Sequence, residues 1–356
     1  MRRGIANLPL HGGRAPRWLF QRMVKLSRAI VEVMLCEFSP EEFLYRLSDP
    51  HWFQALGNVL GFDWHSSGLT TTTTGALKEA ILSLNTPRIL VAGGKGKSAI
   101  STPEQIESLA ERYGFNPYPI IKSSRLSAKV DTALLQDGYS LYHHTIFFTP
   151  GGKWAVVQQG MKEETSYARR YHWLSDMLKD FFEEPHTAIS AQKKEELVLD
   201  LTSHNSYKNR AVIVELSREK PEKIEKKIAS LKTLTLPRRH KLLSSDINPG
   251  NLRKAMILTY ERAPANIEEV LEIRGVGAKF IRALSLVSDI IFGAPVSFED
   301  PAVYSYAHGG KDGTPYPVDR NVYDATIEVL ERAIKKAKIG EREKLKALKK
   351  ISEVFK

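Results

Sequence analysis

Hydrophobic residues near the start of the chain recur at intervals of three and four, which is the spacing of an amphipathic helix. This spacing predicts helical structure from Pro16 to Leu60. Within it, Ser39-Pro40-Glu41-Glu42 combines a capping residue, a proline and two acidic residues, and predicts a second helix that runs through Leu47. The recurring positions are Trp18, Leu19, Met23, Leu26, Ile30, Val33 and Met34.

Strand patterns come further along the chain. The apolar run Arg88–Ala92 predicts a short buried strand, and the segment Thr102–Tyr113 has the pattern of a helix. From Tyr139 to Gln159, two stretches rich in β-branched and aromatic residues flank the turn Thr149-Pro150-Gly151-Gly152, which predicts a β-hairpin. Helices and strands therefore coexist in the first half of the chain.

The pattern changes near Pro185, after which the chain is helical and rich in lysine and glutamate. We expect two domains: a mixed α/β domain with a β-hairpin over residues 1–185, and an all-helical domain over residues 186–356. The 356 residues, of which 42% are hydrophobic, are enough to bury two cores. The expected fold class is therefore α+β.

The segment Leu271–Lys279 carries the most specific pattern in the chain. Gly275 and Gly277 flank the apolar Val276, between a helix capped near Asn266 and a second helix expected over Ala278–Phe292. Two glycines permit a tight turn that aims N–H groups outward at a helix N-terminus, where the helix dipole favours an anion. Lys279 and Arg282 add positive charge, so we expect nucleic-acid binding by Gly275, Val276, Gly277, Lys279 and Arg282.

From this segment onward, the chain resembles the helix-hairpin-helix base-excision DNA glycosylases of the endonuclease III type. The matching stretches, in the same order, are Gly275-Val276-Gly277-Ala278-Lys279, Ile290-Ile291-Phe292-Gly293-Ala294-Pro295 and Pro317-Val318-Asp319. The resemblance implies that Lys279 is an amine nucleophile that forms a Schiff base with the sugar. It implies that Asp319 activates this lysine and stabilises the positive charge that develops on the sugar.

The chain departs from that family's pattern at three points. Residues 296–316 are inserted before the aspartate, and Asp319-Arg320-Asn321 stands where the family has Asp-Thr-His. Cys36 is the only cysteine, so the cysteine quartet of an iron–sulfur cluster is absent, and no cofactor is identified. The alternatives are a phosphate contact for Lys279 and a helix N-cap for Asp319.

Charge and composition limit the class of partner. The formal charge of +11 favours a polyanion, with DNA as the expected partner and RNA as the second. No apolar run reaches the roughly 18 residues of a membrane span, and the start of the chain lacks a secretory pattern. Together with the single cysteine, this predicts a cytoplasmic protein without a membrane partner. The lysine- and glutamate-rich helices are typical of thermophile proteins.

A second set of candidate nucleic-acid contacts lies in Tyr167-Ala168-Arg169-Arg170-Tyr171-His172-Trp173. Basic and aromatic residues alternate there. Basic side chains hold phosphate, and aromatic rings stack on an exposed nucleobase. We expect Arg169 and Arg170 to contact nucleic acid. The alternative is a helix whose Trp173 and Leu174 face the core.

A metal-dependent nuclease centre in the first domain is a further hypothesis. Asp131, Asp137, Gln158 and one of the histidines 143 and 144 would hold a hard cation that activates water. The two histidines are adjacent on a predicted strand, so they face opposite sides of the sheet. The alternative is a histidine that is simply hydrogen-bonded within the sheet.

Over nearly its full length the chain also resembles an uncharacterised family of archaea and heat-loving bacteria. The stretches that carry this resemblance are residues 1–13, 61–68, 91–97 and 156–161. That resemblance implies no reaction. The leading hypothesis is a DNA-binding repair protein, with glycosylase or abasic-site lyase activity from Lys279 and Asp319. The alternative is a non-catalytic nucleic-acid-binding protein, or a nuclease with its active site in the N-terminal domain.

Overall fold

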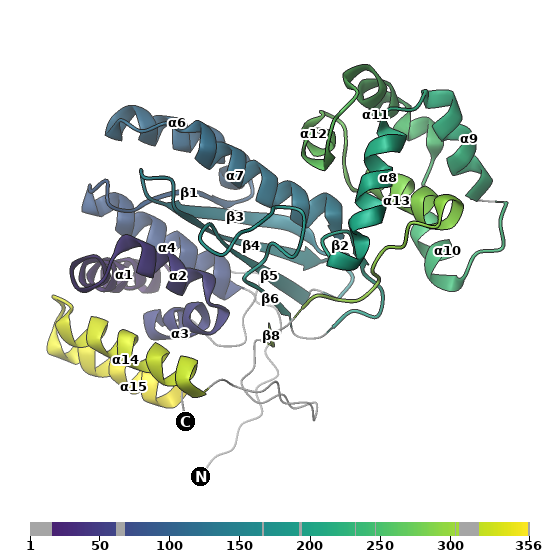
Figure 1. Cartoon of the computed structure of the whole chain (residues 1–356). Coiled ribbons are helices and arrows are strands. Elements are labelled where there is room, and N and C mark those ends of the chain that lie inside the picture. The colour runs from purple at the N-terminus through teal and green to yellow at the C-terminus, as the bar shows by residue number, and fades with distance from the viewer. Residues whose placement is uncertain are drawn as a thin grey trace, which may run out of the picture.

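A computed structural model describes residues 16–61, 68–165, 167–191, 194–231, 233–245, 247–302, 304–305 and 320–354 (Figure 1). For residues 304–305, 320–326 and 352–354 the backbone alone is described. Asp319 and the stretches 1–13 and 62–67 lie outside this range.

A sheet in the order β1-β3-β4-β5-β6-β8 forms the centre of the molecule. Neighbouring strands are antiparallel except for β6 and β8, which pair in parallel. A second, two-stranded sheet pairs β2 (Leu135–Gln136) with β7 (Leu199–Asp200). The strands of the large sheet are β1 (Leu90–Lys95), β3 (Ser140–Phe148), β4 (Trp154–Lys162), β5 (Tyr167–Leu174), β6 (Ala188–Ala191) and β8 (Tyr304–Ser305).

The predicted hairpin is confirmed as β3 and β4, which are joined through the turn after Thr149. Both faces of this hairpin are buried, so its strands do not alternate between a buried apolar face and an exposed polar face. His143 and His144 face opposite sides, as the alternation predicts: the His143 Nε2 lies 2.9 Å from the Thr74 hydroxyl, and the His144 Nε2 lies 2.8 Å from the Ser124 hydroxyl. Helices therefore cover both faces of the sheet.

One face of the sheet is covered by the first four helices. Ser39 caps the start of α2 and Asp49 caps the start of α3, and each cap is followed by a proline in the first turn. Phe43, Trp52 and Leu77 from these helices pack on the sheet with exposures of zero. The helices are α1 (Arg17–Glu37), α2 (Pro40–Ser48), α3 (Pro50–Leu60) and α4 (Gly68–Leu84).

The other face is covered by α6 (Thr102–Tyr113), α7 (Tyr118–Lys129) and the π-helical turn η1 (Val130–Leu134). The short α5 (Lys97–Ile100) connects β1 to α6. Apolar residues of α6 and α7 continue without interruption into the core of a helical unit, which Figure 1 shows at one end of the sheet. That unit contains α8 (Tyr207–Ser217), α9 (Pro221–Leu231), α10 (Arg238–Ser244), α11 (Pro249–Arg262), α12 (Ile267–Glu272) and α13 (Ala278–Phe292).

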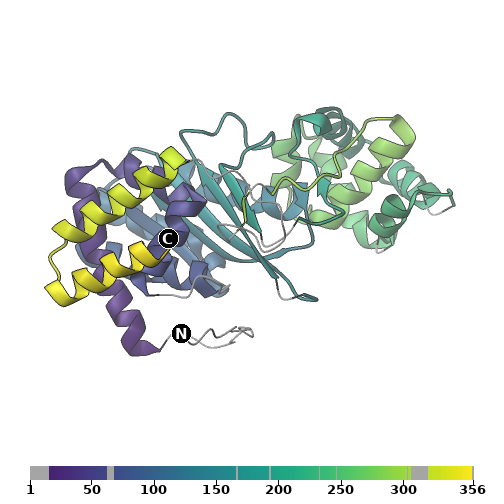
Figure 2. The same cartoon turned by 90° about the horizontal axis from the view of Figure 1, so that it is seen from below.

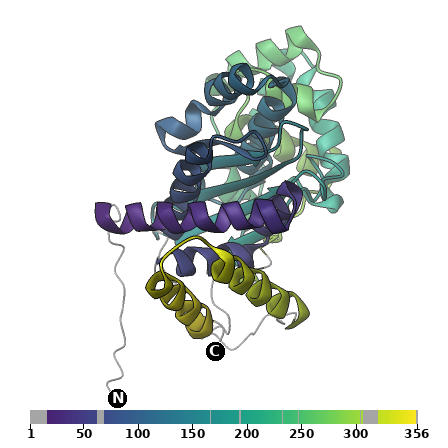
Figure 3. The same ribbon diagram turned by 90° about the vertical axis from the view of Figure 1, so that its left-hand side faces the viewer.

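The last two helices, α14 (Arg320–Lys336) and α15 (Glu341–Val354), return to the beginning of the chain. Leu330, Ile334 and Ile351 are buried in one cluster with residues of α1 and α3. The views in Figures 2 and 3 show these two helices beside α1 and at the opposite end of the molecule from α8–α13. The layer of helices on this face of the sheet, which we call the first layer, thus contains α1–α4 together with α14 and α15.

The α+β class is confirmed, with the sheet in the first half and a helical unit in the second. The segment boundaries differ from the sequence expectation, because β6 and β7 lie after residue 185 and yet pair within the sheets. The helices after residue 320 pack on the first layer rather than on α8–α13. Among the residues described, no helix combines the length and the apolar character of a membrane span.

Candidate nucleic-acid interface

The helix-hairpin-helix is formed by α12, the turn Ile273–Gly277 and α13. Asn266 begins α12, because its side chain accepts the Glu269 amide at 3.0 Å while the Glu269 carboxylate accepts the Ala265 amide at 2.7 Å. The Val276 amide donates to the Ile273 carbonyl at 3.1 Å, which closes the turn. Gly275 adopts φ +93°, a conformation that favours glycine.

Apolar side chains fix the hairpin to the core. Ile273, Val276, Phe280 and Ile281 are at most 2% exposed, so the apolar residue between the two glycines points inward. Close packing of these four buried side chains fixes the position of the turn relative to α13.

The inner side of the hairpin is also held by polar contacts from the first half of the chain. The Lys129 ammonium donates to the Val276 carbonyl at 2.9 Å, and the Gln136 side-chain amide donates to the Ala278 carbonyl at 2.9 Å. Sequence reasoning missed both residues, and spacing holds no signal for them because they lie 147 and 142 positions from their partners. The carbonyl groups of Val276 and Ala278 thus point toward the first half of the chain.

The outer side of the hairpin presents amide groups. The N–H groups of Gly275, Gly277 and Ala278 donate to no acceptor among the residues that the structure describes, and Gly277 caps α13 without a side chain. Gly275 is exposed, and Gly277 and Ala278 are half-buried. Uncapped amides at the start of a 15-residue helix favour an anion, since the helix dipole adds to their own partial charges.

Positive side chains border these amides. Arg274 and Lys279 are exposed, on either side of the two glycines. Arg282 lies one turn further along α13, half-buried, and its guanidinium donates to the Leu243 carbonyl at 3.4 Å. The Lys279 amine and the proposed anion site therefore share one surface, whereas Asp319 lies outside the described residues.

Arg169 lies in the interior rather than on a nucleic-acid surface. It is on β5 with no exposed area, and its guanidinium donates to Asp300 at 2.6 and 3.0 Å and to Asp137 at 3.0 Å. Tyr139 packs against the same guanidinium, with its ring centre 4.6 Å away. Arg169 therefore balances two buried carboxylates, and the expectation that it contacts nucleic acid is not supported.

Arg170 is also buried, on the opposite face of β5, with 1% exposure. Its guanidinium packs on Phe53, and it donates to His172 at 2.8 Å and to Gln54 at 3.1 Å. Tyr167–Leu174 is a central strand, so neither a stacking surface nor a helix is formed there. The basic and aromatic side chains of this strand are divided between the two faces of the sheet. Arg169 and Arg170 are therefore not part of the candidate interface.

Three of the residues considered for a nuclease centre do meet, beneath α7. The Gln158 side chain joins His144 to Asp131: its carbonyl accepts from His144 Nδ1 at 2.7 Å and its amide donates to the Asp131 carboxylate. Burial lowers the pKa of His144, which keeps its ring neutral in this network. His186 and Trp173 donate to the same Asp131 carboxylate, the latter at 3.0 Å.

Asp137, the fourth candidate, belongs to the separate cluster of Arg169 and Asp300. Within the described part of the chain, no group of three or more His, Cys, Asp or Glu side chains is arranged to hold a metal ion. The Asp131 carboxylate accepts three side-chain donors, which is the environment of a structural hydrogen-bond network.

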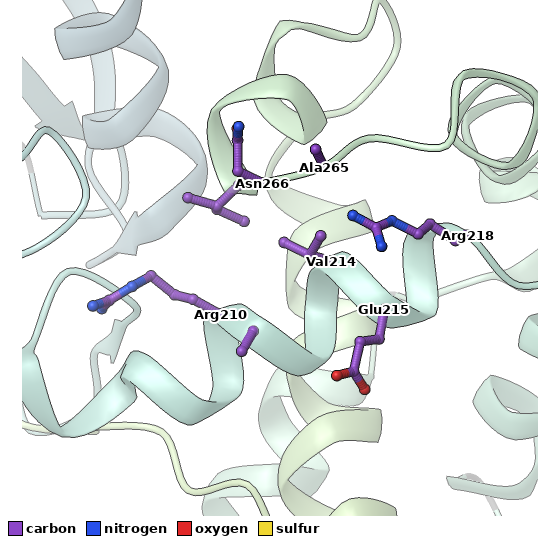
Figure 4. A pocket seen from close by; sticks show the side chains of 8 residues that line it. Arg210, Val214, Glu215, Arg218, Ala265 and Asn266 are labelled. Atoms are coloured by element: carbon purple, nitrogen blue, oxygen red, sulfur yellow. The ribbon is translucent and has the colours of Figure 1, made fainter.

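A hollow of about 380 Å³ lies between α8 and the start of α12 (Figure 4). Both arginines in its wall are engaged elsewhere. Arg210 donates to Glu183 at 2.6 Å, and Arg218 donates to the Pro264 carbonyl at 2.6 Å. The first contact joins α8 to the segment before β6, and the second joins α8 to the segment before α12. We assign no ligand to the hollow.

The model of one protein family matches residues 4–318, and that family is described as "Protein of unknown function (DUF763)". No curated protein and no solved structure matches the chain. The matched span contains the described strands through β8, the helical unit and the hairpin.

Proposed function

The chain belongs to the DUF763 family, and we propose that it binds nucleic acid, DNA in the first place, through the hairpin Ile273–Lys279. One observation carries this proposal: the carbonyl groups of Val276 and Ala278 accept from Lys129 and Gln136, while the amides of Gly275, Gly277 and Ala278 donate to no acceptor among the described residues. An arrangement of this kind favours a phosphate group.

The chemistry of these contacts predicts binding without strong sequence preference. Backbone amides and exposed cations recognise phosphate and carry no information on base identity. Exposed Arg274 and Lys279 add charge–charge attraction, which falls as salt rises because bound counterions are released from the nucleic acid. The overall charge of +11 supports the same class of partner.

The variant Gly277→Ser tests this proposal, because it places a hydroxyl where the phosphate would lie. Serine is a preferred helix N-cap and would satisfy the amides of α13 from within the chain. Gly277 has extended backbone with φ −143°, and a Cβ at this position meets no atom within 4 Å. We expect fluorescence anisotropy to show binding at least about fivefold weaker for duplexes of any sequence, with the thermal midpoint kept or raised.

Gly340→Ser is the matched control. Gly340 starts α15 on the other layer, accepts the Lys344 amide at 3.0 Å, and also has open space for a Cβ. We expect this variant to bind as the wild type does. Unchanged binding by Gly277→Ser, or a loss confined to some sequences, contradicts the proposal. Parallel titrations with single-stranded DNA and with RNA identify the preferred nucleic acid.

A lyase reaction is the second candidate, favoured by the exposed position of Lys279 in the first turn after the hairpin. Its amine would add to the C1′ aldehyde carbon of an abasic sugar and lose water to form an imine, which borohydride reduces to a stable amine. We expect a covalent adduct with abasic DNA that is missing in Lys279→Ala. Metal-dependent cleavage that is unaffected by Lys279→Ala instead favours a nuclease.

A further inference from the structure

Helix α7 lies directly beside the helix-hairpin-helix, held by contacts at two levels. The Lys122 ammonium forms an ion pair with Glu268 in α12, and the Lys129 ammonium donates to the Val276 carbonyl in the turn. These contacts join the length of α7 to the length of α12 and its turn. The hairpin therefore forms one continuous surface with a helix of the first half of the chain.

Arg125 lies between these two contacts. Lys122, Arg125 and Lys129 are separated by three and four positions, so they succeed one another along a single face of α7. Arg125 is exposed, and the structure gives it no ion-pair or hydrogen-bond partner among the described residues. Arg125 therefore adds an exposed positive charge to the face of α7 that carries the two contacts with the hairpin.

The neighbouring cations on this face, Lys122 and Lys129, form contacts within the protein. Lys122 is neutralised by Glu268, and burial lowers the pKa of Lys129, whose ammonium is directed inward to Val276. Arg274 is exposed in the turn itself. Arg125 on α7 and Arg274 in the turn are thus exposed arginines of the two segments that the Lys129 contact joins.

We propose that the phosphate backbone held by the hairpin continues across α7, and that Arg125 contacts a phosphate next to those bound by Gly275 and Gly277. The inference rests on the proposed function and extends its interface to the first half of the chain. A guanidinium group donates two parallel hydrogen bonds to phosphate oxygens, so arginine is well suited to this contact. The partner is the same DNA strand that the turn binds.

The test is Arg125→Gln, measured with a duplex of about 20 base pairs over a range of salt concentrations. One lost phosphate contact is expected to reduce the slope of log K against log salt by about one, and to weaken binding several-fold at low salt. Arg125 is exposed and has no hydrogen bond or ion pair among the described residues, so the thermal midpoint should stay unchanged. Arg125→Glu should weaken binding further, because it adds repulsion.

Arg342→Gln is the matched control, since Arg342 is an exposed arginine on α15, which packs on the opposite layer. It removes the same net charge and should leave the slope at the wild-type value. If Arg125→Gln keeps the wild-type slope and affinity while Gly277→Ser weakens binding, this inference is overturned and the proposed function stands. If the wild type binds no nucleic acid, both are overturned.

Discussion

Lys129 and Val276 are 147 residues apart in sequence, and the lysine ammonium donates to the valine carbonyl at 2.9 Å. Burial lowers the pKa of Lys129 because desolvation disfavours the charged ammonium, and the hydrogen bond to the Val276 carbonyl offsets part of that cost. Through it, the position of the glycine turn depends on α7 and hence on the sheet. The hairpin is not an independent module attached to the rest of the chain.

Replacement of Lys129 by methionine should therefore destabilise the protein and loosen the turn. A hydrogen bond from a charged donor contributes about 1.5–3 kcal/mol, so we expect the free energy of unfolding to fall by about 2 kcal/mol in urea titrations. Lys153→Met is the control, because Lys153 pairs with Asp176 at an exposed site where such pairs contribute less than about 1 kcal/mol. Equal losses in both variants would show that the Val276 contact is weak.

The two glycines of the turn should respond differently to substitution. At Gly275 the positive φ strains any L side chain, so Gly275→Ala should lower the free energy of unfolding by about 1–2 kcal/mol. Gly277 has extended backbone, and Gly277→Ser should change that free energy by no more than a few tenths of a kcal/mol. Chemical denaturation of both variants checks the difference. A larger loss at Gly277 would mean that its backbone conformation is the strained one.

Asp300 should be essential for stability because Arg169 cannot reach solvent. Asp300→Asn removes the carboxylate that binds both terminal nitrogens of the guanidinium and leaves Asp137 as its remaining carboxylate partner. Each lost hydrogen bond between charged groups costs about 1.5–3 kcal/mol. We expect a fall of about 3 kcal/mol in thermal or urea unfolding, with the salt slope of nucleic-acid binding unchanged in the folded fraction. Asp176→Asn, at an exposed pair, should cost less than about 1 kcal/mol. A changed salt slope would indicate that Arg169 does contribute to nucleic-acid binding.

Stability should fall in mild acid because three buried histidines are held neutral. Burial, with smaller contributions from His144, Lys95 and Lys78, lowers the pKa of His143 from 6.5 to about 3, and burial also lowers the pKa values of His144 and His172. Between pH 3 and 6.5 the unfolded chain binds the His143 proton and the folded chain does not, so the free energy of unfolding rises with pH through this window.

The largest contribution of one histidine to that dependence is about 1.4 kcal/mol per pH unit. His143→Gln should therefore flatten the stability curve between about pH 4 and 6, apart from any constant loss. His204→Gln is the control: it removes an exposed histidine whose pKa is raised by Glu183, so its effect has the opposite sign. An unchanged curve in His143→Gln would show that His143 is protonated in the folded protein.

Local features of this fold could be predicted from sequence. The second hairpin helix begins at Ala278 and ends at Phe292, as predicted. Its bounds are set by the flanking Gly277 and Gly293. The cap at Asn266 and the strands around Thr149 also depend on neighbours within a few residues. Such elements are determined by turn chemistry and periodicity, and both are visible in a single sequence.

The long-range features could not be predicted. Arg169 resembled a surface residue because the carboxylate that neutralises it, Asp300, lies 131 positions away. Without that partner, a charged side chain in a central strand would be prohibitively costly. In the same way, no spacing rule connects Lys129 to Val276. The basic α14 and α15 have the sequence pattern of solvent-exposed helices, and only the structure shows that they pack on α1 and α3.

The return of α14 and α15 to α1 and α3 has a consequence for synthesis of the protein. Lys350 donates to the Asn58 carbonyl at 3.2 Å, and Lys336 pairs with Glu37. Asn58 and Glu37 are therefore synthesised 292 and 299 residues before their partners. On the ribosome, α1 and α3 expose an apolar surface until α14 and α15 have emerged. Nascent chains stalled before residue 320 should therefore recruit chaperones at that surface, and release of the finished chain should end the recruitment.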